Sequence, residues 1–311
     1  NNWISPIMKY HFPFFIQSGV DGWQHIYPDD KYTYDNIDLS VKSCLEYNAI
    51  GYSTSLWSDA IQTLMRNSWI YMAYGGIVSW KGSPADRDQF LNEYCKIIYL
   101  DVSNEMVNAF KKLNEAQMYF EKCFHERHTL PDMFENPFSE FSLKNTNEHV
   151  NDYKQARLAA EDAEESLIAA LQKNTSDSEF IKTLLVNARL LDYTGMRFLF
   201  AKTIVDYWDD YVSGKGIKDS WIMFYDIEHS EHGLTDNVLE YISEIKPEYK
   251  QAWLSQYMPY RMNDMLERFD AEYNFWYDVR LKIQYYKHHY DIDKHPATFE
   301  ETFKSLIHPL D

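Results

Sequence analysis

Cysteine is scarce in this sequence, which has Cys44, Cys95 and Cys123 among its 311 residues. The count is odd and the spacing matches no ligand motif, which argues against a disulfide framework and against a zinc site. Cys44 also shows no signature of a catalytic nucleophile. The low count leaves the compartment open, because periplasmic proteins also exist without disulfides.

Long apolar runs and an excess of positive charge are missing as well. No segment is apolar over a stretch long enough to span a bilayer, so no membrane span is expected. Asp and Glu number 48 against 30 Lys and Arg, which gives a net charge of -18. A chain this acidic repels nucleic acid and anionic lipid, so neither is an expected partner.

The amino end lacks an initiator Met and a signal peptide. Residues 1–4 lead almost at once into an apolar run that is typical of a strand. We therefore expect the chain to be part of a longer protein whose signal peptide lies upstream. The expected location is periplasmic or secreted.

Aromatic residues, by contrast, are abundant, at 17% of the chain with 25 Tyr and 9 Trp. Most of them are expected to fill large interfaces between helices, because aromatic side chains bury much apolar surface. A few near the amino end suit sugar binding, since the apolar face of a pyranose stacks on an aromatic ring. The chain has 45% hydrophobic residues, and its length favours two structural units.

Two strand–helix units are predicted near the amino end. The uncharged runs 12–17 and 49–57 predict buried strands, each followed by a helix, over 34–47 and 61–80. Uncharged strands that alternate with helices are typical of parallel βα units. Two such units would leave open hydrophobic edges, so further strands upstream are expected.

Beyond residue 82 the pattern becomes helical. Apolar residues recur at spacings of three and four with polar outer faces, which predicts a packed helical bundle. A long loop is predicted over 127–148, and a new helix is expected to start at Pro247. Helices are predicted over 83–100, 103–125, 150–173, 176–211, 235–245 and 262–290.

A Trp and a carboxylate follow the second predicted strand. Trp57 ends the run that begins at Gly51, and Asp59 comes two residues later. In barrel enzymes, residues at the carboxyl ends of strands face the active site. The ring suits stacking on a sugar, and the carboxylate suits accepting hydrogen bonds from hydroxyls. The alternative interpretation is a packing Trp followed by a helix-capping Asp, a common role for each residue type.

This stretch resembles the last barrel strand of family 20 glycoside hydrolases, the β-N-acetylhexosaminidases. In that family a Gly-led apolar run is followed by Trp, one residue and Glu, which correspond here to Gly51, Trp57 and Asp59. The family uses the Trp as a wall of the sugar pocket and the acid to bind sugar hydroxyls. Asp59 is one methylene shorter than the usual Glu.

The preceding segment, residues 14–28, resembles the seventh strand and loop of a divergent bacterial branch of this family. It lacks the usual Tyr-x-Asp, so Gln17, Ser18 and Trp23 are the candidate substrate-binding residues by position. The resemblance covers about residues 10–100. It implies a mainly α fold in which 1–100 supply the last two βα units of a (β/α)8 (TIM) barrel, and 101–311 form an all-helical region.

The resemblance also implies a reaction, the retaining hydrolysis of a terminal N-acetylglucosamine- or N-acetylgalactosamine-type residue. In this family the 2-acetamido oxygen attacks the anomeric carbon, and an adjacent Asp-Glu pair on the fourth strand assists. No Asp-Glu pair lies on a predicted strand here, since Glu161-Asp162 falls in an Ala-rich helix. The chain is thus expected to supply pocket-wall residues, to lack the acid pair, to be inactive alone and to need no cofactor.

Two alternatives stay open. One is a non-catalytic helical module that binds carbohydrate or another protein, and the other is a related barrel hydrolase with a different sugar specificity. A metal site is also considered at Glu228, His229, Glu231 and His232. Their spacing matches no strong template, so a polar loop is favoured there and no metal ligand is assigned.

Overall fold

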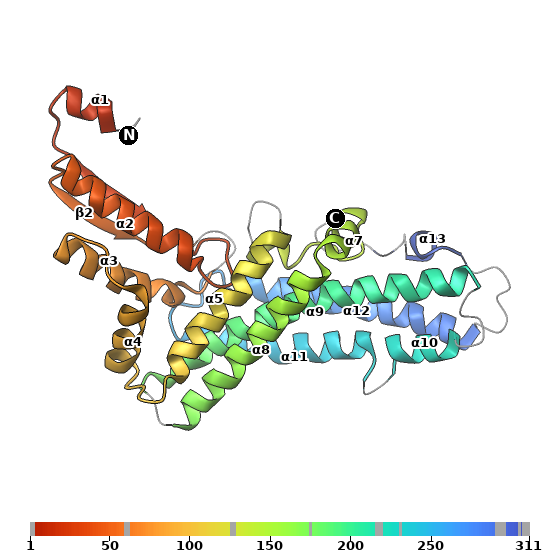
Figure 1. The fold of residues 1–311 in the computed structure, drawn as a ribbon. Coiled ribbons are helices and arrows are strands. Elements are labelled where there is room, and N and C mark those ends of the chain that lie inside the picture. The colour runs from red at the N-terminus through yellow and green to blue at the C-terminus, as the bar shows by residue number, and fades with distance from the viewer. Residues whose placement is uncertain are drawn as a thin grey trace.

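A computed structural model of the protein describes residues 4–58, 63–124, 129–173, 176–214, 220–229, 232–289, 297–303 and 306. Helices make up 74% of the structure, so the fold is mainly α. The elements, shown in Figure 1, are α1 (Ile4–Lys9), β1 (Phe15–Gly19), α2 (Asp30–Glu46), β2 (Gly51–Ser55), the 3-10 helix η1 (Met65–Ser68), α3 (Trp69–Lys81), α4 (Arg87–Ile98), α5 (Glu105–Cys123), α6 (Thr129–Asp132), α7 (Glu140–Glu148), α8 (Val150–Gln172), α9 (Ser178–Val212), α10 (Ser220–Ile227), α11 (Leu234–Leu254), α12 (Met262–His289) and α13 (Phe299–Phe303).

The two strands are parallel neighbours, paired from Phe15 with Gly51 to Gly19 with Ser55. Side chains alternate between the two faces of a sheet. Helix α3 covers the face that carries Thr54, since a Cβ added at Gly75 of α3 would lie 2.4 Å from Thr54 Oγ1. The opposite face carries Phe15, which is 65% exposed. One face of the sheet is therefore covered and the other is open.

The prediction of the last two βα units of a (β/α)8 barrel is wrong for this structure. Among the described residues, β1 and β2 pair only with each other, whereas a barrel closes eight strands on themselves. Figure 1 shows the sheet with α2 at one end of the molecule, beside a much longer helical part and without a ring of helices around it. Local pattern predicts a strand, but the number of strands in a sheet depends on long-range pairing.

The long helices form a layered stack in which α5 packs on α8, α8 on α9, α9 on α11, and α11 on α12. Alanines on the buried side of α8 let its neighbours approach closely, and Gly195 of α9 does the same from the other side. A Cβ at Gly195 would lie 3.2 Å from the Tyr153 carbonyl oxygen of α8. The middle of α9 is buried all round, which is typical of a central helix.

A buried ion pair joins α9 to α12. Arg197 Nε donates to Glu272 Oε1 at 2.6 Å, and the two side chains are 0% and 1% exposed. The Tyr193 hydroxyl and the Trp276 indole N–H donate to the same oxygen, at 3.0 and 2.9 Å. Arg197 Nη1 donates to the carbonyl oxygen of Met133 at 2.6 Å, which adds the segment after α6 to the network.

Two predictions about the helical region are wrong. The segment 127–148 was expected to be a loop, yet α6 and α7 lie within it. Pro247 was expected to start a helix, but α11 runs through it. Proline in a helix interior removes a backbone hydrogen bond. Here burial of Ile245 and Tyr249 on either side of Pro247 holds the helix in place.

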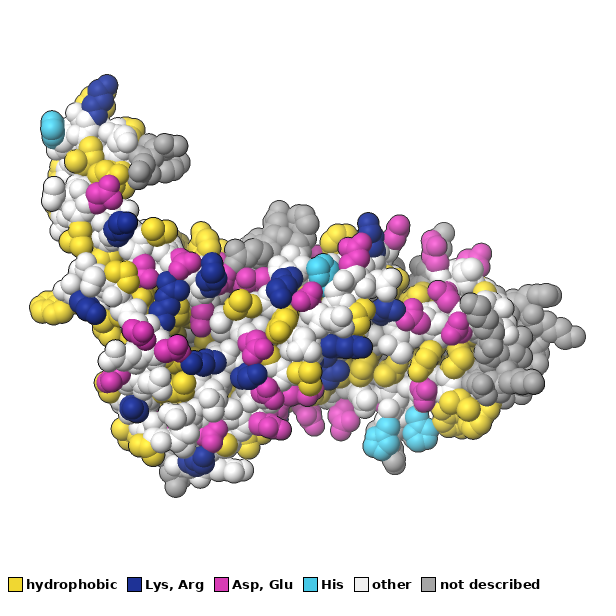
Figure 2. Space-filling model, viewed as in Figure 1, with side chains coloured by type: hydrophobic (Ala, Val, Ile, Leu, Met, Phe, Trp, Pro, Cys, Tyr) yellow, Lys and Arg dark blue, Asp and Glu magenta, His cyan; other side chains and the backbone are white. Residues whose placement is uncertain are grey.

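The visible surface mixes both signs of charge. Figure 2 shows Asp and Glu side chains interspersed with Lys and Arg over the helical part, with smaller apolar areas between them. Ion pairs such as Lys112–Asp162, at 3.0 Å, account for part of this pattern. Within the described segments, no helix has both the length and the apolar character needed to cross a bilayer.

Replacement of Arg197 by Met is expected to lower the free energy of unfolding by about 3–5 kcal/mol, because Glu272 would keep a buried charge without its cation. Urea unfolding followed by circular dichroism measures this loss. The double variant Arg197→Met/Glu272→Leu serves as the control and should recover much of it, since it removes both charges. The prediction would be contradicted if Arg197→Met lowered the free energy of unfolding by only about 1 kcal/mol, the effect of an average substitution.

Candidate functional site

The carboxyl ends of the two strands meet at one edge of the sheet, as parallel strands require. Val20 N donates to the Ser55 carbonyl oxygen at 3.0 Å and extends the ladder past the last pair. Ser55 Oγ donates to the Ser18 carbonyl oxygen at 3.1 Å. The Trp57 indole N–H in turn donates to Ser55 Oγ at 3.1 Å. A chain of hydrogen bonds thus fixes the orientation of the Trp57 ring.

Trp23 lies against the same edge, where Gly19 gives its ring room. A Cβ at Gly19 would lie 3.0 Å from Trp23 Cζ3 and 3.8 Å from Ser55 Oγ. Trp23 is half-buried by this packing, whereas Trp57 is 58% exposed. Two indole rings from two different loops therefore lie on the open face of the sheet, each near the Ser55 hydroxyl.

The other sequence-based candidates are placed differently. Gln17 is exposed, and the strand alternation puts it on the open face, paired with Ser53. Ser18 is buried, and its hydroxyl hydrogen-bonds with the Tyr52 hydroxyl at 2.5 Å on the face that α3 covers. Ser18 thus contributes its carbonyl to this edge and not its side chain. Asp59 lies outside the described residues.

This edge offers an oriented aromatic face together with neutral polar groups. Gln17, Ser53 and Ser55 supply an amide and two hydroxyls on the open face, and the Ser55 hydroxyl contacts the Trp57 indole. Such a set suits a neutral, hydroxylated ligand better than an ion. The Glu161-Asp162 pair lies on α8, where Asp162 pairs with Lys112, as expected for a solvated helix face.

A second cluster, which the sequence did not indicate, lies at the start of α2. The Tyr71 hydroxyl donates to Asp30, beside a cleft of about 260 Å³ lined in part by Tyr34 and Arg87. Burial, followed by the charge of Asp29, raises the pKa of Asp30 to about 7, against the opposing effects of Tyr71 and Arg87. In the sequence, Asp29-Asp30 looks like an ordinary helix start, so the contact of Asp30 with Tyr71 was not detectable.

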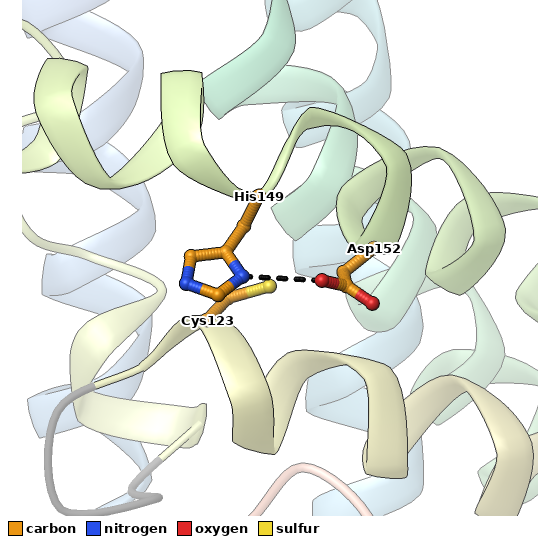
Figure 3. Close-up of side chains that lie close together, drawn as sticks. All are labelled: Cys123, His149 and Asp152. Atoms are coloured by element: carbon orange, nitrogen blue, oxygen red, sulfur yellow. Dashed lines mark hydrogen bonds and ion pairs between the residues drawn. The ribbon is translucent and has the colours of Figure 1, made fainter.

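A third cluster brings together Cys123, His149 and Asp152 (Figure 3). Cys123 ends α5, His149 is the residue before α8, and Asp152 lies in the first turn of α8. His149 Nδ1 lies 3.1 Å from Asp152 Oδ2. Burial, followed by the charge of Asp152, raises the pKa of the Cys123 thiol to about 12. This cluster is not evident in the sequence, because Cys123 comes from the end of α5 whereas His149 and Asp152 come from the start of α8.

The metal site considered near Glu228 is not supported by the geometry. Lys287 Nζ lies 2.8 Å from Glu228 Oε2, and Arg280 contacts the other carboxylate oxygen at 3.6 Å. The backbone N–H of His229 donates to Asp236. Glu231 lies outside the described residues. The Glu228 carboxylate is therefore paired with the side chains of Lys287 and Arg280 and is not placed as a metal ligand.

Comparisons of the chain with protein-family models, curated proteins and solved structures found no match. The resemblance to family 20 glycoside hydrolases therefore stays a prediction from the sequence.

Asp30 is expected to make stability depend on pH. Between about pH 4 and 7 the folded protein holds a proton on Asp30 that the unfolded chain has released, so the free energy of unfolding falls as the pH rises. Asp30→Asn removes this effect, so the stability of the variant relative to wild type should increase from pH 4 to pH 7. Urea unfolding across this range measures the difference.

The matched control is Asp35→Asn. Its carboxyl is exposed, and the hydrogen bond from Arg87 lowers its pKa, so it is ionised in both states over most of the same range. The stability difference of this variant should therefore change little with pH. An equally flat difference for Asp30→Asn would show that Asp30 titrates normally.

Proposed function

We propose that the carboxyl edge of the β1–β2 sheet binds a sugar ring, with Trp57 as the stacking surface. The observation that carries the proposal is that Trp57 is 58% exposed while its indole N–H is held by Ser55. Side-chain entropy usually opposes binding, and here the hydrogen bond orders the ring in advance. An exposed aromatic ring in a set orientation is suited to the apolar face of a pyranose.

The neighbours of Trp57 support the same ligand class. Trp23 presents a second ring near the Ser55 hydroxyl, and Gln17 and Ser53 add polar groups on the open face. Ligand sites commonly combine apolar walls with a few placed polar groups. A pyranose presents the matching pattern, with an apolar ring face and a rim of hydroxyls.

The sugar class we propose is a terminal N-acetylhexosamine, and the reaction is its retaining, substrate-assisted hydrolysis. This choice is supported by the resemblance of Gly51, Trp57 and Asp59 to the family 20 pattern. In this proposal Trp57 and Trp23 form walls of the pocket. No described residue is assigned as the general acid, so the proposed role of this chain is binding and positioning.

Trp57→Ala is expected to weaken binding of N-acetylglucosamine oligomers at least tenfold, which corresponds to about 1.4 kcal/mol. Titration calorimetry with the full chain measures the Kd. The control is Trp80→Ala, because Trp80 is 95% exposed on α3 and its loss removes an indole elsewhere. Equal affinities of the two variants would refute the role of Trp57. Equal binding of glucose oligomers would refute the N-acetylhexosamine class.

Ser55→Ala retains the Trp57 side chain but removes the hydrogen-bond acceptor of its indole N–H. A neutral hydrogen bond contributes about 0.5–1.5 kcal/mol, so affinity is expected to fall by up to about tenfold, less than in Trp57→Ala. Calorimetry under the same conditions gives the comparison. Ser53→Ala, which removes a hydroxyl not bonded to the indole, is the matched control. Unchanged affinity in Ser55→Ala would mean that ring orientation is unimportant.

A further inference from the structure

We propose that Cys123, His149 and Asp152 bind a divalent transition-metal ion, with zinc as the best match. The three side chains converge where the end of α5 meets the start of α8 (Figure 3). A thiol, an imidazole and a carboxylate are the ligand types that zinc uses in proteins. Calcium and magnesium prefer sets of oxygen ligands, which this cluster does not offer. The site is independent of the proposed sugar edge.

The separations within the cluster fit tetrahedral coordination. Nitrogen and oxygen ligands at about 2.0–2.1 Å from zinc lie roughly 3.3 Å apart, close to the 3.1 Å between His149 Nδ1 and Asp152 Oδ2. All three ligand atoms lie within 4.8 Å of one another. Closing the sulfur distances to those of a bound zinc therefore requires a movement of at most about 1 Å.

The positions of the three residues are set by packing. Asn145 Nδ2 donates to the Cys123 carbonyl oxygen at 2.5 Å, which ties the end of α5 to α7. Tyr153, next to Asp152, is fully buried against the rings of Phe120 and Phe124. Ligands held by well-packed elements lose little freedom on binding, which favours affinity.

Binding requires a specific change of protonation. Burial keeps the Cys123 thiol neutral before a metal binds. Its proton would pass to solvent as the sulfur–metal bond forms. His149 would bind through Nδ1, so the proton that Nδ1 shares with Asp152 Oδ2 would have to leave this nitrogen, and the bound ring would carry its proton on Nε2. Lys122 Nζ lies 3.4 Å from Asp152 Oδ1, the carboxylate oxygen other than the one facing His149. At 54% exposure this lysine can turn to solvent.

The His149 and Asp152 side of the cluster is partly exposed to solvent. The side chains of His149 and Asp152 are 31% and 28% exposed, whereas Cys123 is buried. Three protein ligands and one water are the arrangement of zinc sites with an open coordination position. We therefore expect water to complete the coordination from the side of His149 and Asp152.

The test is a titration of the metal-free full chain with Co²⁺, followed by absorption spectroscopy. A thiolate–cobalt charge-transfer band should appear with one equivalent of metal and disappear when Zn²⁺ is added. His149→Gln and Asp152→Asn should each weaken Co²⁺ binding at least tenfold. His149→Gln is a mild change, since this residue makes no side-chain cap to α8. Circular dichroism confirms that each variant is folded.

The thiol is tested separately, because Cys123 is buried and its replacement affects packing. Cys123→Ser should abolish the charge-transfer band, whereas Cys44→Ser and Cys95→Ser should retain it. Absence of the band in the wild-type chain would overturn the proposal. So would a band that persists in Cys123→Ser, or Co²⁺ affinity that is unchanged in both His149→Gln and Asp152→Asn.

Discussion

The buried pair of Arg197 and Glu272 is the constraint on which the helical part depends. Each charge can be buried only because the opposite charge lies 2.6 Å away. The pair therefore fixes how far α9 and α12 are shifted along each other. The hydrogen bonds from Tyr193 and Trp276 to the same carboxylate oxygen further restrict the position of α12 relative to α9. With α9 fixed, the small residues of α8 allow it to pack closely on α9 and to align with α5.

This packing is also what places the cluster of Cys123, His149 and Asp152. The thiol comes from the last residue of α5, and the other two groups come from the first turn of α8 and the residue before it. Their approach therefore follows from how two long helices pack along each other, and not from a local motif. A metal site of this kind would stabilise this packing, because binding free energy adds to the stability of the folded state.

The two-stranded sheet, unlike the helical part, is covered on one side and open on the other. The open face collects Gln17, Trp23 and Trp57 close to the carboxyl ends of the strands. Contiguous exposed apolar patches commonly mark binding surfaces. In the proposed role of this surface, the hydrogen bond from Trp57 to Ser55 favours one orientation of the ring before a ligand binds.

The sequence by itself determined the kinds and approximate limits of many elements, including α8, α9, α12 and the two strands, and it singled out Trp57. Periodic burial is a local property that leaves its mark on residue spacing. Only the tertiary structure decided that the sheet has two strands in the described chain, that α11 continues through Pro247, that Tyr71 contacts Asp30, and that Cys123 lies close to His149. These features depend on contacts between residues far apart in the chain, and no spacing of residue types encodes them.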